Sequence, residues 1–108
     1  MKKIIAVIRP ESIFDVLAEL DSKGFSSVTR FDVLGKGKQR GLKVGDTYYN
    51  EIPKEMIMMV VEDDSCEEVT SIITNLCKSS EGGAYGDGKI FVSEVLKAIT
   101  ISSGKEEL

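Results

Sequence analysis

Two short runs of the sequence are apolar on both alternations of an extended chain, and they constrain the fold most. The first is Ile4-Ile5-Ala6-Val7-Ile8, and the second is Met56-Ile57-Met58-Met59-Val60-Val61. Successive side chains of a strand point to opposite faces of a sheet, so strands of this composition are normally buried on both faces. The fold must therefore cover two faces of the sheet that contains these strands.

Two amphipathic helices are predicted to cover the first face. One begins at Arg9-Pro10-Glu11, with proline in the first turn, and stops at Gly24. The other follows Asp64, which forms a plausible capping pair with Glu67 three residues later. Their apolar stripes are Ile13, Val16, Leu17 and Leu20 in the first helix, and Val69, Ile72, Ile73 and Leu76 in the second.

The order of elements predicts the fold class. Strands are expected at residues 2–8, 25–34, 54–61 and 90–95, with a further short strand at 98–101. The order βαββαβ is typical of an α+β, ferredoxin-like antiparallel sheet with two helices on one face. We expect a single domain over residues 1–108 with a long loop at 35–53. Because two helices cover one face only, we also expect a homo-oligomer to cover the other.

Composition excludes several functions. The 108 residues carry a formal net charge of −4, which argues against general nucleic-acid binding. There is no histidine, the commonest general base and metal ligand, so neither an enzyme nor a zinc site is expected. No apolar run approaches the roughly 20 residues of a membrane span, so we expect a cytoplasmic protein without membrane insertion. Cys66 and Cys77 lie roughly 16 Å apart on one helix and cannot form a disulfide with each other.

A glycine turn, Gly86-Asp87-Gly88-Lys89, runs directly into the fourth strand. Glycines allow positive φ and leave backbone N–H groups open to an anion, to which the lysine adds positive charge. A turn followed by a strand is not a Walker phosphate loop, which needs a helix N-terminus. An ordinary reverse turn remains the alternative. The long loop likewise combines Gly35, Gly37, Gly41 and Gly45 with Lys36, Lys38, Arg40 and Lys43, which could be a solvated basic segment.

Several motifs together resemble the PII signal-transduction proteins, regulators of nitrogen metabolism. They are Ile8-Arg9-Pro10-Glu11, Gly35-Lys36-Gly37-Lys38-Gln39-Arg40-Gly41, Ile52-Pro53-Lys54, Glu62-Asp63-Asp64 and Gly86 to Val92. The shortened long loop is similar to that of the subgroup encoded alongside nitrogenase, which regulates that enzyme by direct contact. The resemblance implies a trimer with three clefts between subunits. Each cleft would bind ATP or ADP and, with Mg-ATP present, 2-oxoglutarate.

The resemblance also implies roles for particular residues. Nucleotide-binding positions would be Thr29, Gly35, Gly37, Lys38, Gln39, Gly86, Asp87, Gly88 and Lys89. Gln39 would coordinate Mg²⁺ through ATP, and Gln39 and Lys54 would bind 2-oxoglutarate. The long loop would contact a target protein, which could be nitrogenase, a transporter or an enzyme of nitrogen metabolism, through Lys36, Arg40, Lys43, Tyr48 and Tyr49. Tyr48 and Tyr49 are not favoured as modification sites.

The sequence departs from this family where cations are expected. Thr100 and Ser102 occupy the positions of two phosphate-binding arginines, and Ser79 to Tyr85 replaces a basic loop with one that carries an acid. Hydrogen bonds to charged groups contribute roughly 1.5 to 3 kcal/mol each, so triphosphate binding would weaken. The site would then prefer ADP or AMP to ATP. The alternative is a trimeric interaction scaffold that has lost ATP and 2-oxoglutarate sensing.

Overall fold

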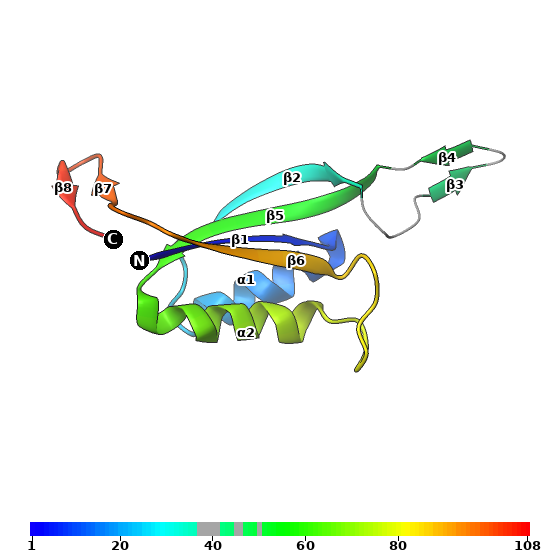
Figure 1. Ribbon diagram of the computed structural model, residues 1–108, viewed down its shortest axis with the longest axis horizontal. Coiled ribbons are helices and arrows are strands. Elements are labelled where there is room, and N and C mark those ends of the chain that lie inside the picture. The colour runs from blue at the N-terminus through cyan, green and yellow to red at the C-terminus, as the bar shows by residue number, and fades with distance from the viewer. Residues whose placement is uncertain (37–41, 45–46, 50) are drawn as a thin grey trace.

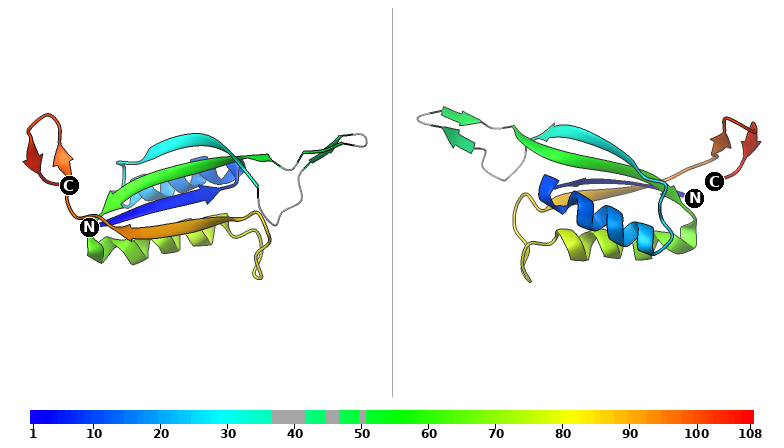
Figure 2. Two further views of the ribbon diagram at one scale, coloured as in Figure 1. Left: turned by 45° about the horizontal axis from the view of Figure 1, so that its top comes forward. Right: turned by 180° about the vertical axis from the view of Figure 1, so that it is seen from behind.

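The computed structural model describes residues 1–36, 42–44, 47–49 and 51–108, with the backbone alone at 42–44 and 47–49. Its central sheet has four antiparallel strands: β1 (Lys2–Ile8), β2 (Thr29–Gly35), β5 (Ile52–Val61) and β6 (Gly88–Glu94). They are ordered β2-β5-β1-β6. Both helices, α1 (Ile13–Ser22) and α2 (Cys66–Cys77), lie on the same face of this sheet (Figures 1 and 2). The predicted ferredoxin-like arrangement is confirmed.

Burial alternates along the two apolar strands, because the helices cover only one face of the sheet. Ile4, Ala6 and Ile8 of β1 are fully buried under the helices, whereas Ile5 and Val7 between them are only half-buried. The same alternation runs along β5, where Ile57, Met59 and Val61 are buried. From α1 and α2 the core adds Ile13, Val16, Leu20, Val69, Ile73 and Cys77.

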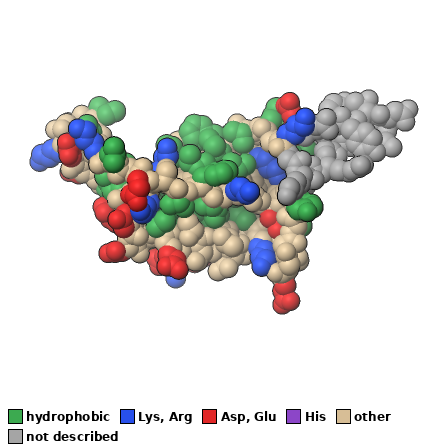
Figure 3. Space-filling model, in the orientation of Figure 1, with side chains coloured by type: hydrophobic (Ala, Val, Ile, Leu, Met, Phe, Trp, Pro, Cys, Tyr) green, Lys and Arg blue, Asp and Glu red, His purple; other side chains and the backbone are tan. Residues whose placement is uncertain are grey.

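The sheet face turned away from the helices, which we call the open face, remains apolar. Cross-strand register places its side chains in rows, with Val7 beside Met56 and Ile5 beside Met58. Phe31 extends the first row across β2, and Phe91 extends the second across β6. Phe31 and Phe91 are 41% and 55% exposed, and hydrophobic side chains gather over the strands on this side (Figure 3). The open face therefore lacks cover within a single chain.

Both helices form where expected, with corrections at their edges. A 3₁₀ turn, Pro10–Ser12, leads into α1, and Gly24 ends the segment at a φ of 89°. In α2 the buried stripe is Val69, Ile73 and Cys77, so Leu76, which was predicted to be in the core, is 40% exposed instead. Cys66 and Cys77 are free, as expected.

The predicted capping pair of the second helix is wrong. A 3₁₀ turn, Asp63–Ser65, precedes α2, and the N-cap residues Glu62 and Ser65 make no side-chain cap hydrogen bond. The backbone closes this turn itself, through Ser65 N–H donating to Glu62 O at 3.0 Å. Asp63 instead accepts a hydrogen bond from the N-terminal amine at 2.9 Å.

The second strand begins later than predicted. Phe25 N–H donates to Leu20 O, which returns the chain toward α1. The side chains of Phe25 and Val28 pack against the core instead of extending the sheet. Regular pairing of β2 therefore starts at Thr29, opposite Met58.

Two small hairpins extend from opposite ends of the sheet (Figure 1). β3 (Leu42–Val44) pairs with β4 (Thr47–Tyr49) inside the segment predicted as a long loop, a hairpin that the sequence analysis did not predict. At the other end, β7 (Ile99–Thr100) pairs with β8 (Lys105–Glu106). In this C-terminal arm Leu96 and Ile101 are each 98% exposed. In the described part of the chain, neither helix has the length and apolar character needed to cross a membrane.

Candidate functional site

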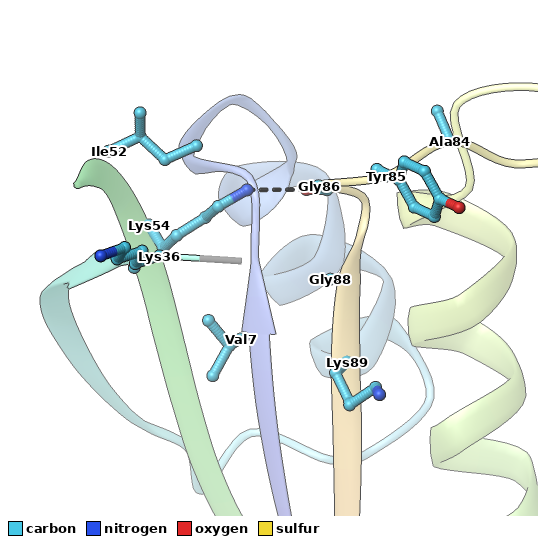
Figure 4. Close-up of a pocket in the computed structure, with 10 residues that line it drawn as sticks. Val7, Lys36, Ile52, Lys54, Ala84, Tyr85, Gly86, Gly88 and Lys89 are labelled. Atoms are coloured by element: carbon cyan, nitrogen blue, oxygen red, sulfur yellow. Dashed lines mark hydrogen bonds between the residues drawn. The ribbon is translucent and has the colours of Figure 1, made fainter. Parts of the chain in front are cut away.

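A cavity of about 520 Å³ opens at the end of the sheet nearest to the β3–β4 hairpin (Figure 4). It lies where β2 ends, β5 begins and the loop at 79–88 leads into β6. Of the residues that the structure describes, ten line it: Val7, Gly35, Lys36, Ile52, Lys54, Ala84, Tyr85, Gly86, Gly88 and Lys89. Segments that are distant in sequence therefore meet here because of the antiparallel sheet.

Register explains why two of the lysines share this corner. Lys89 pairs with Val7, and Lys54 pairs with Val33, so both side chains belong to the open face. Lys36 follows directly after β2. Among the described lining residues there are three lysines and no carboxylate, so the cavity is electropositive and suited to an anion.

Lys54 spans the cavity. Its Nζ donates a hydrogen bond to Gly86 O at 2.7 Å, joining β5 to the loop at 79–88 (Figure 4). Desolvation by burial, followed by the positive charge of Arg9, lowers the pKa of Lys54, while Glu11 and Asp87 oppose this shift. An anionic ligand near Nζ would favour the charged lysine.

The glycines of the turn are required by geometry. Gly88 has a φ of +130°, and a Cβ there would lie 2.2 Å from the backbone oxygen of Val7. A Cβ on Gly35 would lie 3.0 Å from Cγ of Lys54, the side chain that is held to Gly86. Glycine at these two positions lets β6 start tightly against β1 and leaves Lys54 in its place.

Asp87 faces away from this cavity. Its Oδ2 accepts hydrogen bonds from the backbone N–H groups of Ser79, at 3.1 Å, and Ala84, at 2.8 Å. These two amides, assisted by Arg9, lower the pKa of Asp87 to about 2. Its side chain lines a neighbouring cavity of about 380 Å³ beside the end of α2.

The structure brings together six of the predicted site residues and separates another. Gly35, Lys36, Lys54, Gly86, Gly88 and Lys89 line one cavity. Thr29 lies at the opposite end of β2 from Gly35, roughly 20 Å away at about 3.3 Å per residue. Thr100 and Ser102 lie in the C-terminal arm, which extends from that opposite end (Figure 1).

Other predicted residues cannot be placed in full. Gly37, Lys38, Gln39 and Arg40 lie outside the described residues, and only the backbone is described at Lys43, Tyr48 and Tyr49. Sequence reasoning missed Val7, Ile52, Ala84 and Tyr85 as lining residues. Val7 lines the cavity because β1 pairs with β6 in a register that sets Val7 beside Lys89. Ile52 is the first residue of β5, and Ala84 and Tyr85 depend on the path of the loop at 79–88. No local sequence signal marks these four residues.

Comparison with known proteins identifies the family. The family model of nitrogen regulatory protein P-II matches residues 1–105. The chain is a member of the P-II family. A P-II relative named "Nitrogen fixation nifHD region glnB-like protein 1", from Methanococcus maripaludis, is 48% identical over 94% of this chain and 93% of its own length.

Other P-II relatives match over nearly the whole chain. A protein of Methanothermobacter marburgensis, also named for the nifHD region, is 44% identical over the full length of both chains. "Nitrogen regulatory protein P-II 2" of Methanothermobacter thermautotrophicus is 36% identical over 97% of this chain and 92% of its own. The chain is thus a GlnB-like regulator of the P-II family, with relatives named for nitrogen fixation.

Proposed function

We propose that this protein is a trimeric P-II regulator that senses adenine nucleotide, and also 2-oxoglutarate, in clefts between subunits. It acts by binding and not by catalysis, and it controls a target protein in the cytoplasm through the segment at 35–53. The observation that carries the proposal is the cavity in which Lys36, Lys54 and Lys89 surround a glycine turn, with no carboxylate among the described lining residues. This is the chemistry that an anionic metabolite requires.

The open face supports assembly from identical chains. Its rows of Ile, Val, Met and Phe side chains are exposed or half-buried in one chain, and other copies would bury them. The cavity lies at the corner of this face. Thr29 and the arm with Thr100 and Ser102 lie at its other end, so a neighbouring chain could bring them to the cavity.

The charges within reach favour a ligand with few phosphates. Lys89 and Lys36 provide positive charge, but Thr100 and Ser102 provide none. We therefore expect ADP to bind with an affinity near or above that of ATP, with AMP as a further candidate. Gln39 would hold Mg²⁺ when ATP is bound. A carboxylate of 2-oxoglutarate would compete with Gly86 O for Lys54 Nζ.

Calorimetry tests the proposal. ATP, ADP and AMP are titrated into the protein with and without Mg²⁺ and 2-oxoglutarate. Lys89→Ala removes a cavity cation and should weaken binding at least about tenfold, the loss expected for one hydrogen bond to a charged group. Lys23→Ala, at the end of α1, is the matched control and should bind as the wild type does. Absence of heat with all three nucleotides would refute nucleotide sensing.

The names of the relatives make nitrogenase the first target to test, before a transporter or another enzyme of nitrogen metabolism. A pull-down of purified target is performed with and without the ligand found by calorimetry. Binding that changes with the ligand supports sensing.

A constitutive scaffold is the second candidate, favoured by the absence of cations at Thr100 and Ser102. It predicts target binding that is equal in all ligand conditions. Substituting Lys89 would then leave target binding unchanged.

A further inference from the structure

The carboxylate of Asp87 makes several of the contacts that hold the loop at 79–88. Oδ2 of Asp87 accepts from the N–H groups of Ser79 and Ala84, which closes the loop on itself. Oδ1 accepts from Nε of Arg9 at 3.4 Å. Asp87 and Arg9 are 15% and 25% exposed, so their contact is largely shielded from water. One carboxylate thus connects the loop to the residue after β1.

Arg9 makes a second contact with the same loop. Its Nη2 donates to Tyr85 O at 3.0 Å, while Nε faces Asp87. A guanidinium can serve two acceptors in different directions because its donors form a rigid, planar fork. Lysine, with a single ammonium on a flexible stem, cannot reproduce this geometry.

These contacts set the direction of a peptide group at the cavity. In a trans peptide the N–H points opposite to the preceding C=O, so holding Tyr85 O toward Arg9 fixes the direction of the Gly86 N–H. Lys54 takes the next carbonyl, Gly86 O, from the β5 side. Two successive carbonyl oxygens, which would repel an anion, are therefore each directed at a cation.

We propose that Arg9 is a positioning residue for anion binding. It holds Asp87 and Tyr85 O, and thereby keeps the turn at Gly86 and Gly88 in the conformation that an anion meets. In this role it acts through the loop, since Arg9 is not among the described residues that line the cavity. This inference rests on the proposed function, and it gives Arg9, the residue directly after β1, a role in the site.

The experiment compares Arg9→Ala and Arg9→Lys with Lys23→Ala, a matched control that removes an equal positive charge at the end of α1. Inorganic pyrophosphate and ADP are the probes, titrated by calorimetry at several salt concentrations. Amide hydrogen exchange of Ser79 and Ala84 is followed by NMR without ligand. Light scattering and circular dichroism establish that each variant keeps the assembly and secondary structure of the wild type.

We expect Arg9→Ala to weaken binding of both probes about tenfold and to speed exchange at Ser79 and Ala84. The salt dependence of binding should stay that of the wild type, whereas Lys89→Ala should reduce it, because Lys89 lines the cavity and Arg9 does not. Arg9→Lys keeps the charge but not the fork, and should recover only part of the affinity. Lys23→Ala should leave both measurements unchanged.

Two results would overturn the positioning role: exchange at Ser79 and Ala84 that stays at the wild-type rate in Arg9→Ala, or a loss of salt dependence equal to that of Lys89→Ala. Wild-type protein that binds neither probe would instead overturn the anion site, and with it the proposed sensing. The exchange measurement, made without ligand, distinguishes the two failures.

Discussion

At the scale of single residues, Gly88 has the closest clash for an added Cβ among the glycines whose surroundings the structure describes. Its φ of +130° is a conformation that side chains rarely adopt, and the backbone oxygen of Val7 occupies the space of a Cβ. Gly82, in the same loop, has no atom within 4 Å of an added Cβ. Glycine is therefore required at position 88, whereas the space around position 82 admits a side chain.

We predict that Gly88→Ala lowers the free energy of unfolding by at least roughly 1–3 kcal/mol, the cost of backbone strain alone, with the clash adding more. Gly82→Ala should stay within about 0.5 kcal/mol of the wild type. Urea denaturation followed by circular dichroism measures both. Equal midpoints for the two variants would contradict the strained turn.

Single residues also show how far the sequence could predict the site. Gly86, Gly88 and Lys89 were predicted because turn chemistry is local and is written in consecutive residues. The contacts of Arg9 with Asp87 and Tyr85 join positions more than seventy residues apart in the chain. No local pattern encodes such a pair, because it depends on the antiparallel pairing of β1 with β6.

At the scale of elements, the loop at 79–88 depends on the ionisation of one carboxyl group. The pKa of Asp87 is lowered to about 2 by amide hydrogen bonds, from an ordinary value near about 3.9. A lowered pKa means that the charged form stabilises the folded loop. This contribution is present above about pH 4 and is lost as the pH falls toward 2.

We therefore predict that the amide resonances of Ser79 and Ala84 shift between about pH 4 and pH 2, as the loop loses its central acceptor. In Asp87→Asn the same resonances should already differ at pH 7 and change little on acidification. NMR titration measures this, with Asp15→Asn on α1 as the control. Resonances in Asp87→Asn that titrate as in the wild type would exclude Asp87 as the cause.

The elements themselves were largely predictable, and their boundaries less so. β1 begins and ends where its apolar run predicts, and the helices bury most of their predicted stripes, with Leu76 of α2 as the exception. β2 starts four residues late because Phe25 and Val28 pack against the core, which alternation alone cannot distinguish from a strand. The cap of α2 was mispredicted because a 3₁₀ turn, Asp63–Ser65, leads into the helix, so the N-cap position falls on Ser65 and not on Asp64.

At the scale of the whole molecule, the most important feature is the open face of the sheet, which no part of the described chain covers. The chain has a radius of gyration of 15.9 Å, against about 13 Å for a compact domain of this length, because arms extend from both ends. One face of the sheet is packed against helices and the other is apolar without cover. The sequence already indicated this imbalance, since β1 and β5 are apolar on both alternations.

We predict that Phe91→Asp, on the open face, shifts the proposed trimer toward monomers, because a charge would have to be buried in the interface. Phe14→Asp, an equally drastic change of an exposed phenylalanine on α1, should leave the trimer intact. Light scattering at micromolar concentration measures both. A monomeric wild type, or a trimeric Phe91→Asp, would contradict the proposed assembly.

The cavity lies at one end of β2 and Thr29 at the other. In the proposed assembly, each chain contributes one half to each of two different clefts. No single chain contains a complete cleft. Dilution would then abolish the response to a metabolite before it unfolded any chain. In a cell that makes few copies of the protein, each chain would be folded, but none would respond to the metabolite.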